Sequence, residues 1–526
     1  MKRLSQEQYV VEMKNIRKQF GDFVANDNIN LKVKKGEIHA LLGENGAGKS
    51  TLMNILSGLY QPTNGEILIN GKPVKFSGPT DAHKHGIGMV HQHFMLVDAF
   101  TVTENIILGD EPAKLGFLEK RKAKKQIETL SQKYHLDVQP TSYIRDISVG
   151  QQQRVEILKT LYRGADVLIF DEPTAVLTPQ EIDELIHIMH ELVKEGKSII
   201  LITHKLDEIK KVADRCTVIR RGRSIDTVDC KDVTSQELAD MMVGRAVSFK
   251  TAKEPAKIGD PILEITDLHV KEARGLDAVA GLNLTVHSGE VVGVAGIDGN
   301  GQTELVKAIT GLAKIESGDI KIKGESIHKK SARQITEMGV GHVPEDRHRD
   351  GIVMEMTVAE NIALQTYYQA PNSRHGVLDY SYIDSHAREL MEEYDVRAAS
   401  ELVEIGNLSG GNQQKAVIAR EVSRHPDLLV VSQPTRGLDV GAIEYIHKRL
   451  IQQRTEGKAV LVVSFELDEI LNVSDRIAVI HDGQIVGIVD PKQTTEKELG
   501  LLMAGYTLEE ARQELKVGGI CATDKE

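Results

Sequence analysis

The 526-residue sequence has no tryptophan, only three cysteines and no long apolar run. Cys216, Cys230 and Cys521 are scattered and lack the spacing of metal ligands, so we expect no cysteine metal site and a reducing compartment. No apolar run approaches the roughly 20 residues that a membrane span needs. Met1–Glu7 lacks the apolar core of a signal peptide. We therefore expect no transmembrane segment, and any membrane role should be peripheral.

A net positive charge is also missing. The formal net charge is −12, whereas proteins that bind nucleic acid usually carry a basic face. We therefore expect no nucleic-acid partner. The composition is that of a globular protein, with 40% hydrophobic residues, and the length allows two to four domains.

The most informative stretch is Gly43–Thr51, which has the Walker A pattern of a phosphate-binding loop. The apolar run Ile38–Leu42 predicts a buried strand before it, and Met53–Leu56 predicts the start of a helix after it. Glycines let the backbone N–H groups surround phosphate oxygens, and the helix N-terminus adds positive charge there. Lys49 would reach the β- and γ-phosphates. The expected ATP-binding residues here are Gly43, Glu44, Asn45, Gly46, Ala47, Gly48, Lys49, Ser50 and Thr51.

Two carboxylates complete the chemistry. Val167–Phe170 predicts a buried strand that ends in Asp171 and Glu172. Ser50 and Asp171 are expected to hold Mg²⁺, and Glu172 to accept a proton from the attacking water or to orient it. In register with the Walker A loop, this pair indicates ATP hydrolysis.

The chain repeats itself. Gly43–Ser50 recurs in altered form 253 residues later as Gly296–Thr303, and Ile147–Gln151 recurs 261 residues later as Leu408–Asn412. Such offsets indicate a duplicated domain of about 250 residues. Short β-branched runs alternate with helical stretches in each copy, which predicts an α/β fold with a mostly parallel sheet. We expect domains at 1–248 and 262–510, joined by a polar linker at 249–261 and followed by a tail at 511–526.

The repeated segments Ile147–Gln151 and Leu408–Asn412 resemble the signature motif of ABC ATPases. The resemblance covers nearly the whole chain. It implies two tandem copies of the P-loop NTPase (ABC ATPase) fold, each with a helical subdomain. It also implies that Gln92 contacts Mg²⁺ and the attacking water, that His204 is the switch histidine, and that Phe20 stacks on adenine, although Phe23 lies nearby.

In this family two such domains pair head to tail, so that each ATP contacts the Walker A loop of one domain and the signature of the other. The resemblance therefore predicts a complete first site that is closed by the second signature. Its members are Phe20, Lys49, Ser50, Gln92, Asp171, Glu172 and His204, closed by Ser409, Gly410 and Gly411.

The second site is predicted to be degenerate. Gln302 stands where the first copy has Lys49, so the cation that would bind phosphate is lost. The remaining counterparts are Thr303 for Ser50, Glu345 for Gln92, Ser432 for Asp171, Gln433 for Glu172 and Phe465 for His204. We expect this site to bind nucleotide weakly at most, and not to hydrolyse it.

The resemblance favours the ATPase subunit of a bacterial importer, at the cytoplasmic face of the cell membrane. Expected partners are two transmembrane permease subunits and, acting through them, a lipid-anchored solute-binding protein. The fused layout is similar to the simple-sugar family, and Ser432–Pro434 together with His91–Met95 is similar to a sub-branch that imports nucleosides. Import of a sugar such as ribose or galactose remains the alternative. A soluble tandem ABC protein acting on ribosomes is a more remote one.

Overall fold

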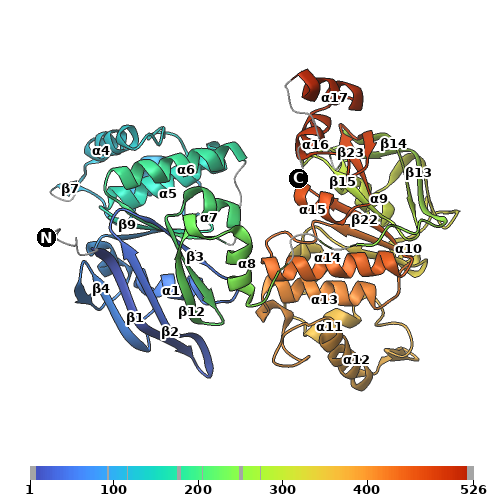
Figure 1. Ribbon diagram of the computed structural model, residues 1–526, viewed down its shortest axis with the longest axis horizontal. Coiled ribbons are helices and arrows are strands. Elements are labelled where there is room, and N and C mark those ends of the chain that lie inside the picture. The colour runs from blue at the N-terminus through green and yellow to red at the C-terminus, as the bar shows by residue number, and fades with distance from the viewer. Residues whose placement is uncertain are drawn as a thin grey trace. The chain divides into compact units, whose positions relative to one another are not determined.

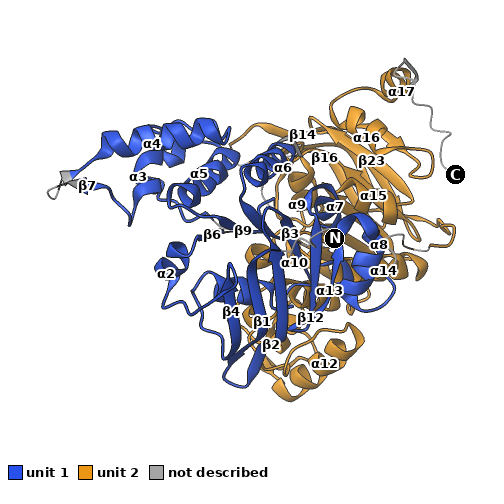
Figure 2. Ribbon diagram, turned by 60° about the vertical axis from the view of Figure 1, so that its left-hand side comes forward, with its two compact units in different colours: residues 1–247, 439–441 blue, residues 248–438, 442–526 orange. Residues whose placement is uncertain are grey.

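The computed structural model describes residues 8–91, 94–114, 117–174, 179–203, 205–247, 251, 253–272 and 274–517. It divides into two units, shown in different colours in Figure 2: residues 1–247 with 439–441, and residues 248–438 with 442–526. Within the described ranges, no helix combines the length and apolar character that a membrane span requires. The boundaries proposed from the sequence stay a prediction.

The first unit alternates strands and helices as predicted (Figure 1). Its strands are β1 (Tyr9–Phe20), β2 (Phe23–Lys34), β3 (Ile38–Leu42), β4 (Asn64–Ile69), β5 (Lys72–Val74), β6 (Ile87–Val90), β7 (Ala113–Lys114), β8 (Phe117–Leu118), β9 (Val167–Asp171), β10 (Ser198–Ile202), β11 (Arg215–Arg220) and β12 (Arg223–Asp229). Its helices are α1 (Lys49–Leu56), α2 (Pro79–Lys84), α3 (Val102–Ile107), α4 (Lys120–Lys133), α5 (Val149–Tyr162), α6 (Pro179–Lys194), α7 (Leu206–Val212) and α8 (Ser235–Val243).

The second unit repeats this order. Its strands are β13 (Pro261–Lys271), β14 (Asp277–His287), β15 (Val291–Ala295), β16 (Ile315–Ile322), β17 (Glu325–Ser326), β18 (Val340–Val343), β19 (Ser373–Arg374), β20 (Val377–Leu378), β21 (Leu428–Ser432), β22 (Ala459–Ser464), β23 (Arg476–His481) and β24 (Gln484–Val489). Its helices are α9 (Gln302–Ile309), α10 (Ala332–Glu337), α11 (Val358–Ala363), α12 (Tyr380–Glu393), α13 (Gly410–Val422), α14 (Val440–Thr455), α15 (Leu467–Val473), α16 (Glu496–Met503) and α17 (Leu508–Val517).

The main sheet of each unit is mostly parallel. Its order is β12-β11-β3-β10-β9-β6 in the first unit and β18-β21-β22-β15-β23-β24 in the second, which is the same order read from the opposite edge. Each unit also has a four-stranded antiparallel sheet, β2-β1-β4-β5 or β14-β13-β16-β17. The central strand β3 is buried along its whole length because other layers cover both faces of the sheet.

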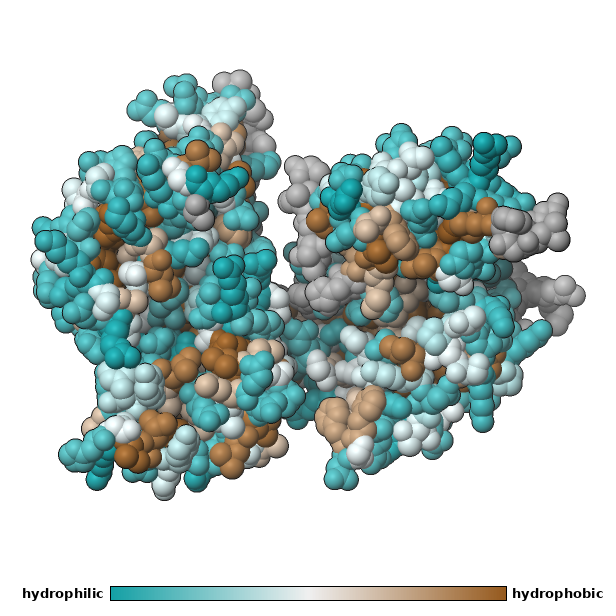
Figure 3. Space-filling view, turned by 180° about the vertical axis from the view of Figure 1, so that it is seen from behind, coloured by the Kyte–Doolittle hydropathy of each residue, from teal (hydrophilic) through white to brown (hydrophobic). Residues whose placement is uncertain are grey.

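A helical part projects from each unit. In the first unit α3, α4 and α5 pack on one another, and in the second α11, α12 and α13 do. Figure 3 shows mostly hydrophilic surface with several separate hydrophobic areas on the face in view. The predicted α/β architecture with two copies and helical subdomains is therefore present.

Candidate ATP site and its altered copy

The phosphate-binding loop and the two carboxylates lie at the same edge of the first main sheet. Strand β3 leads into the loop, and β9 ends at Asp171. Strand β10 lies between them, with Ile202 in register with both Leu41 and Asp171. Two strand spacings, about 10 Å, therefore separate the end of β3 from Asp171. Carboxyl ends of parallel strands are where such folds bind ligands.

The loop backbone requires glycine at particular places. Gly46 and Gly48 have φ angles of +80° and +99°, which L side chains rarely adopt. A Cβ atom on Gly48 would also lie 2.6 Å from the Ala25 carbonyl oxygen and 2.5 Å from Asn26 Nδ2. The buried Asn26 amide donates a hydrogen bond to the Gly48 carbonyl (2.9 Å), which holds the loop against β2. No sequence pattern indicated this role of Asn26.

Lys49 is the first residue of α1, so the helix begins four residues earlier than the sequence suggested. The loop itself ends in the helix, and Gly48 is its N-cap. The Lys49 ammonium is buried and donates hydrogen bonds to the carbonyls of Gly43 (2.6 Å) and Glu44 (3.0 Å). Burial lowers the pKa of Lys49, and the charges of Glu172 and Asp171 oppose that shift. A cation held over the loop in this way is suited to phosphate.

The carboxylate pair fits a divalent cation. Burial, followed by the charge of Glu172, raises the pKa of Asp171 to about 6. Burial and the neighbouring carboxylate both disfavour a free negative charge on Asp171, and a hard cation that takes oxygen ligands would stabilise that charge. Ser50, exposed at the start of α1, offers a hydroxyl oxygen for the same ion. Glu172 follows with φ +45°, and its backbone N–H donates to the Ile202 carbonyl (2.9 Å), which turns the chain sharply after Asp171.

Two predicted members of this site, Gln92 and His204, lie outside the described residues. Phe20, the expected adenine platform, ends β1 and is 42% exposed. The Lys18 ammonium lies 4.9 Å from its ring centre, and the Tyr60 ring packs edge-on at 5.4 Å. Phe23, the neighbouring aromatic, is 65% exposed and pairs with Phe20 across the β1–β2 hairpin. Phe20 is therefore the less exposed of the two rings, and Lys18 and Tyr60 pack against it.

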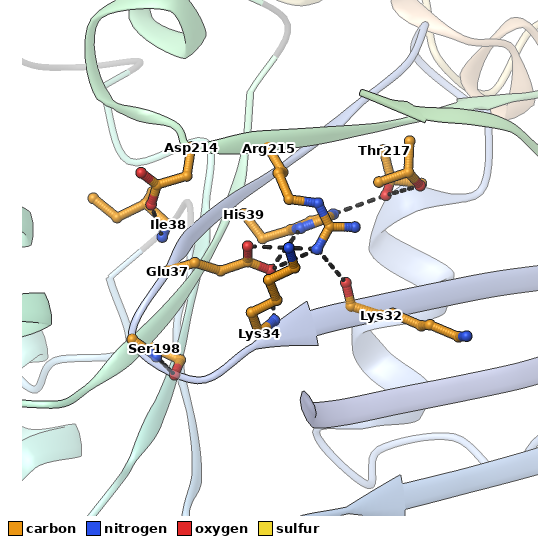
Figure 4. A network of polar contacts seen from close by, with 11 residues as sticks. Lys32, Lys34, Glu37, Ile38, His39, Ser198, Asp214, Arg215 and Thr217 are labelled. Carbon is orange, nitrogen blue, oxygen red and sulfur yellow. Dashed lines mark hydrogen bonds and ion pairs between the residues drawn. The ribbon is translucent and has the colours of Figure 1, made fainter. Parts of the chain in front are cut away.

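A buried polar network holds the strand that carries the loop (Figure 4). His39 of β3 is fully buried; its Nδ1 lies 3.1 Å from Glu37 Oε1 and its Nε2 lies 2.7 Å from Thr217 Oγ1. Arg215 donates to Glu37 (3.3 Å), and the Asp214 carboxylate accepts from the Ile38 backbone N–H (2.9 Å). Burial lowers the pKa of His39, although Glu37 opposes the shift. The imidazole is therefore held in its neutral form.

The loop of the second unit has the same backbone with different side chains. Gly299 and Gly301 have φ angles of +89° and +97°, and a Cβ on Gly301 would lie 2.1 Å from the Ala278 carbonyl oxygen. Gln302, at the position of Lys49, is buried and donates from Nε2 to the Ile297 carbonyl (3.0 Å). Ile297 corresponds to Glu44, so the amide reaches the carbonyl that the ammonium reaches in the first unit. The charge is lost, and one loop carbonyl is reached instead of the two that Lys49 reaches.

The other replaced residues are also tied into the fold. Gln433 has φ +48°, its N–H donates to the Val463 carbonyl (2.8 Å), and its Oε1 accepts from the Phe465 N–H (3.3 Å). The Thr303 hydroxyl donates to Glu345 Oε2 (3.3 Å), and Arg436 Nη1 donates to Glu345 Oε1 (3.1 Å). Ser432 is buried at the end of β21. Arg436 was not among the predicted site residues.

The two signature motifs begin the corresponding helices differently. Ser148 caps α5 in a capping box with Gln151. Ser409 precedes α13, and its hydroxyl oxygen accepts from the Asn412 amide (3.1 Å) instead of from the helix backbone. The pairing of each loop with the signature of the other copy stays a prediction.

Comparison with known proteins supports the repeat. The family model described as ABC transporter matches residues 26–175 and 279–436. The chain is 70% identical to the "Nucleoside import ATP-binding protein NupA" of Lactococcus lactis subsp. cremoris, over 95% of this chain and 99% of that protein. It is 60% identical to the "Guanosine import ATP-binding protein NupO" of Bacillus subtilis, over 96% and 99%. The "Ribose import ATP-binding protein RbsA" of Bacillus subtilis is 38% identical, over 94% and 99%.

These matches cover both copies of the loop, the carboxylates Asp171 and Glu172 with their neutral counterparts, and both helical parts. The predicted family and fold are thereby confirmed. The chain belongs to the ABC transporter family, and it carries two copies of the ABC ATPase domain in tandem.

Proposed function

We propose that this chain is the ATP-hydrolysing subunit of a membrane ABC importer of nucleosides, and that it has one competent ATP site. The main support is the contrast between its two phosphate-binding loops. The first has Lys49 and the carboxylates Asp171 and Glu172, whereas the second has Gln302 and neutral counterparts on the same backbone. The nucleoside cargo is supported by the names of the relatives that are 70% and 60% identical.

The proposed reaction divides among the residues of the first unit. The N–H groups of the loop and the Lys49 ammonium bind the β- and γ-phosphates, with Phe20 under the adenine. Ser50 and Asp171, with Gln92, would hold Mg²⁺, which neutralises phosphate charge when bound. Glu172 takes a proton from the attacking water. His204 is assigned the catalytic role of the switch histidine by family resemblance.

The partners follow from the importer assignment. Two permease subunits in the membrane would receive the conformational change, with a lipid-anchored solute-binding protein delivering cargo to them. The chain would then lie peripherally at the cytoplasmic face of the membrane. Import of a simple sugar is the second candidate, since the ribose relative is 38% identical over nearly the same length.

Uptake by cells tests the proposal. Cells that lack this gene would be complemented with the wild-type chain or with Glu172→Gln, and given labelled guanosine, adenosine or ribose. We expect guanosine and adenosine uptake with the wild type and its loss with Glu172→Gln. Loss of ribose uptake alone would instead favour the sugar importer, and unchanged uptake of all three would refute the importer role.

A further inference from the structure

The second unit has an arginine, Arg436, bonded to the counterpart of a residue proposed to contact Mg²⁺ in the first unit. Thr303 corresponds to Ser50 and Glu345 to Gln92, the two residues proposed to contact Mg²⁺ in the first unit. In the second unit these two side chains bond to each other, Thr303 Oγ1 to Glu345 Oε2 at 3.3 Å. The other Glu345 oxygen accepts from Arg436 at 3.1 Å. One guanidinium and one hydroxyl therefore occupy both oxygens of the carboxylate.

The loop beside this trio keeps its capacity for phosphate. Gly299 and Gly301 keep the left-handed conformations of Gly46 and Gly48, and α9 begins directly after Gly301, so the backbone of the phosphate-binding loop is retained. Gln302 donates a hydrogen bond to the loop carbonyl of Ile297 and adds no charge to the loop. An anion site thus remains in place, although Lys49 has no charged counterpart there.

The balance of charged side chains around the phosphate-binding loop differs between the two units. In the first unit one ammonium, that of Lys49, faces the two carboxylates Asp171 and Glu172, so a polyphosphate there needs an additional cation. In the second unit the corresponding positions are neutral, and Glu345 is balanced by Arg436. Arg436 corresponds to Ala175 in the first copy, so this cation is specific to the second. Its side chain is 65% exposed, so the guanidinium remains accessible to a phosphate.

We propose that the second unit binds a nucleoside triphosphate without a divalent cation, with Arg436 in the role that Mg²⁺ has in the first unit. The guanidinium offers five N–H donors in a planar fork that suits phosphate oxygens. Glu345 orients it and is itself fixed to the loop through Thr303. This inference rests on the proposed nucleotide chemistry of the fold, and it assigns the second unit a metal-independent, non-hydrolytic site.

The test measures binding of a fluorescent mant-ATP probe to the full chain carrying Lys49→Ala, which disables the first site. Titrations are run with Mg²⁺ and with EDTA. We expect binding that chelation changes by less than about threefold, and that Arg436→Ala weakens at least about tenfold, as loss of a charge-assisted contact implies. Arg512→Ala is the matched control, because Arg512 is also an exposed arginine paired with a glutamate, Glu498 in α16.

A second variant tests the geometry. Glu345→Gln installs the residue of the first unit and removes the charge that orients Arg436, so binding in EDTA should weaken and Mg²⁺ should then strengthen it. Binding that requires Mg²⁺, binding in EDTA that Arg436→Ala leaves unchanged, or no binding at all would each overturn the inference. Mg²⁺-dependent ATPase activity of the wild-type chain would in those cases still support the proposed function, so the two failures are distinguishable.

Discussion

Replacing Lys49 by glutamine gives the first unit the residue that the second unit has at the same backbone position, Gln302. The second unit shows that glutamine fits there, because the buried Gln302 reaches the carbonyl of Ile297 at 3.0 Å, as Lys49 reaches that of Glu44. The lysine is buried, and burial lowers its pKa, so its charge is held at a cost in desolvation. We therefore expect Lys49→Gln to fold and to lose no stability in urea unfolding.

The catalytic loss should be large. A hydrogen bond to a charged group contributes about 1.5–3 kcal/mol, and we propose that Lys49 makes such bonds to two phosphates. The loss of about 3–6 kcal/mol corresponds to a fall of roughly 10²–10⁴ in kcat/KM, since each 1.4 kcal/mol is tenfold. The assay is phosphate release by the purified chain with Mg²⁺ and ATP.

The reciprocal change serves as the control. Gln302→Lys restores the cation of the second loop but leaves Ser432 and Gln433 without carboxylates, so it should add no ATPase activity to Lys49→Gln. A Lys49→Gln chain that keeps more than about a tenth of the wild-type rate would refute the assignment of the first site. Activity gained from Gln302→Lys would show that the second site is not degenerate.

Three further variants test the proposed base, the glycines of the loop and the buried histidine. Glu172→Gln should lower ATPase activity about 10²–10⁴-fold while mant-ATP binding stays within about threefold, and an equal loss of binding would contradict a role in proton transfer. Gly48→Ala adds a backbone strain of about 1–3 kcal/mol and a clash, whereas Gly46→Ala adds strain alone because no atom lies within 4 Å of its Cβ; urea unfolding should show the larger loss for Gly48. The pKa of His39 is lowered in the folded chain, so below about pH 6.5 the folded chain binds fewer protons than the unfolded chain and its stability falls with pH. The double variant His39→Val with Thr217→Ala should reduce this fall between pH 7 and pH 5 by up to about 1.4 kcal/mol per pH unit. An unchanged pH profile of the urea midpoint would exclude His39 as the source.

The second unit supplies the model for that double variant. Val292 and Ala478 stand where the first unit has His39 and Thr217, on strands paired in the same way. Both are fully buried. An apolar pair therefore fills the place of the histidine–threonine bond. In the double variant Glu37 loses its contact with His39 but still accepts from the Lys34 backbone N–H and from Arg215. The Thr227 hydroxyl loses its 2.8 Å bond to Thr217 but is exposed to water.

Local pattern sufficed for the parts of the fold that local sequence controls. The strand expected at Ile38–Leu42 has those bounds as β3, and the strand expected from Val167 is β9, which ends at Asp171. Continuous apolar runs between turn residues specify such buried parallel strands. Because the sequence repeats, the fold of the second unit could be predicted from that of the first. The helix after the loop began earlier than expected, at Lys49, because the loop's last glycine caps it directly.

Contacts between segments that are distant in the chain could not be predicted from the sequence. Asn26 reaches the loop from β2, and its position in an alternating strand gave no reason to separate it from other polar residues. Arg436 lies 91 residues from Glu345, so nothing local indicated that the two would meet. Substitution patterns between the copies could have found it, because Arg436 replaces Ala175 beside three other lost charges.

The backbone at the carboxyl end of β9 and β21 does not depend on the side chains that the first unit has there. Glu172 and Gln433 both adopt left-handed conformations, which cost about 1–2 kcal/mol for a residue with a Cβ. Gln433 pays this cost without any carboxylate to position, because its N–H completes the sheet edge through the Val463 carbonyl, as that of Glu172 does through Ile202. Sheet hydrogen bonding therefore sets the geometry, and the side chains on it are free to change. This independence explains how one copy could lose its cation and carboxylates while the fold around them stayed the same.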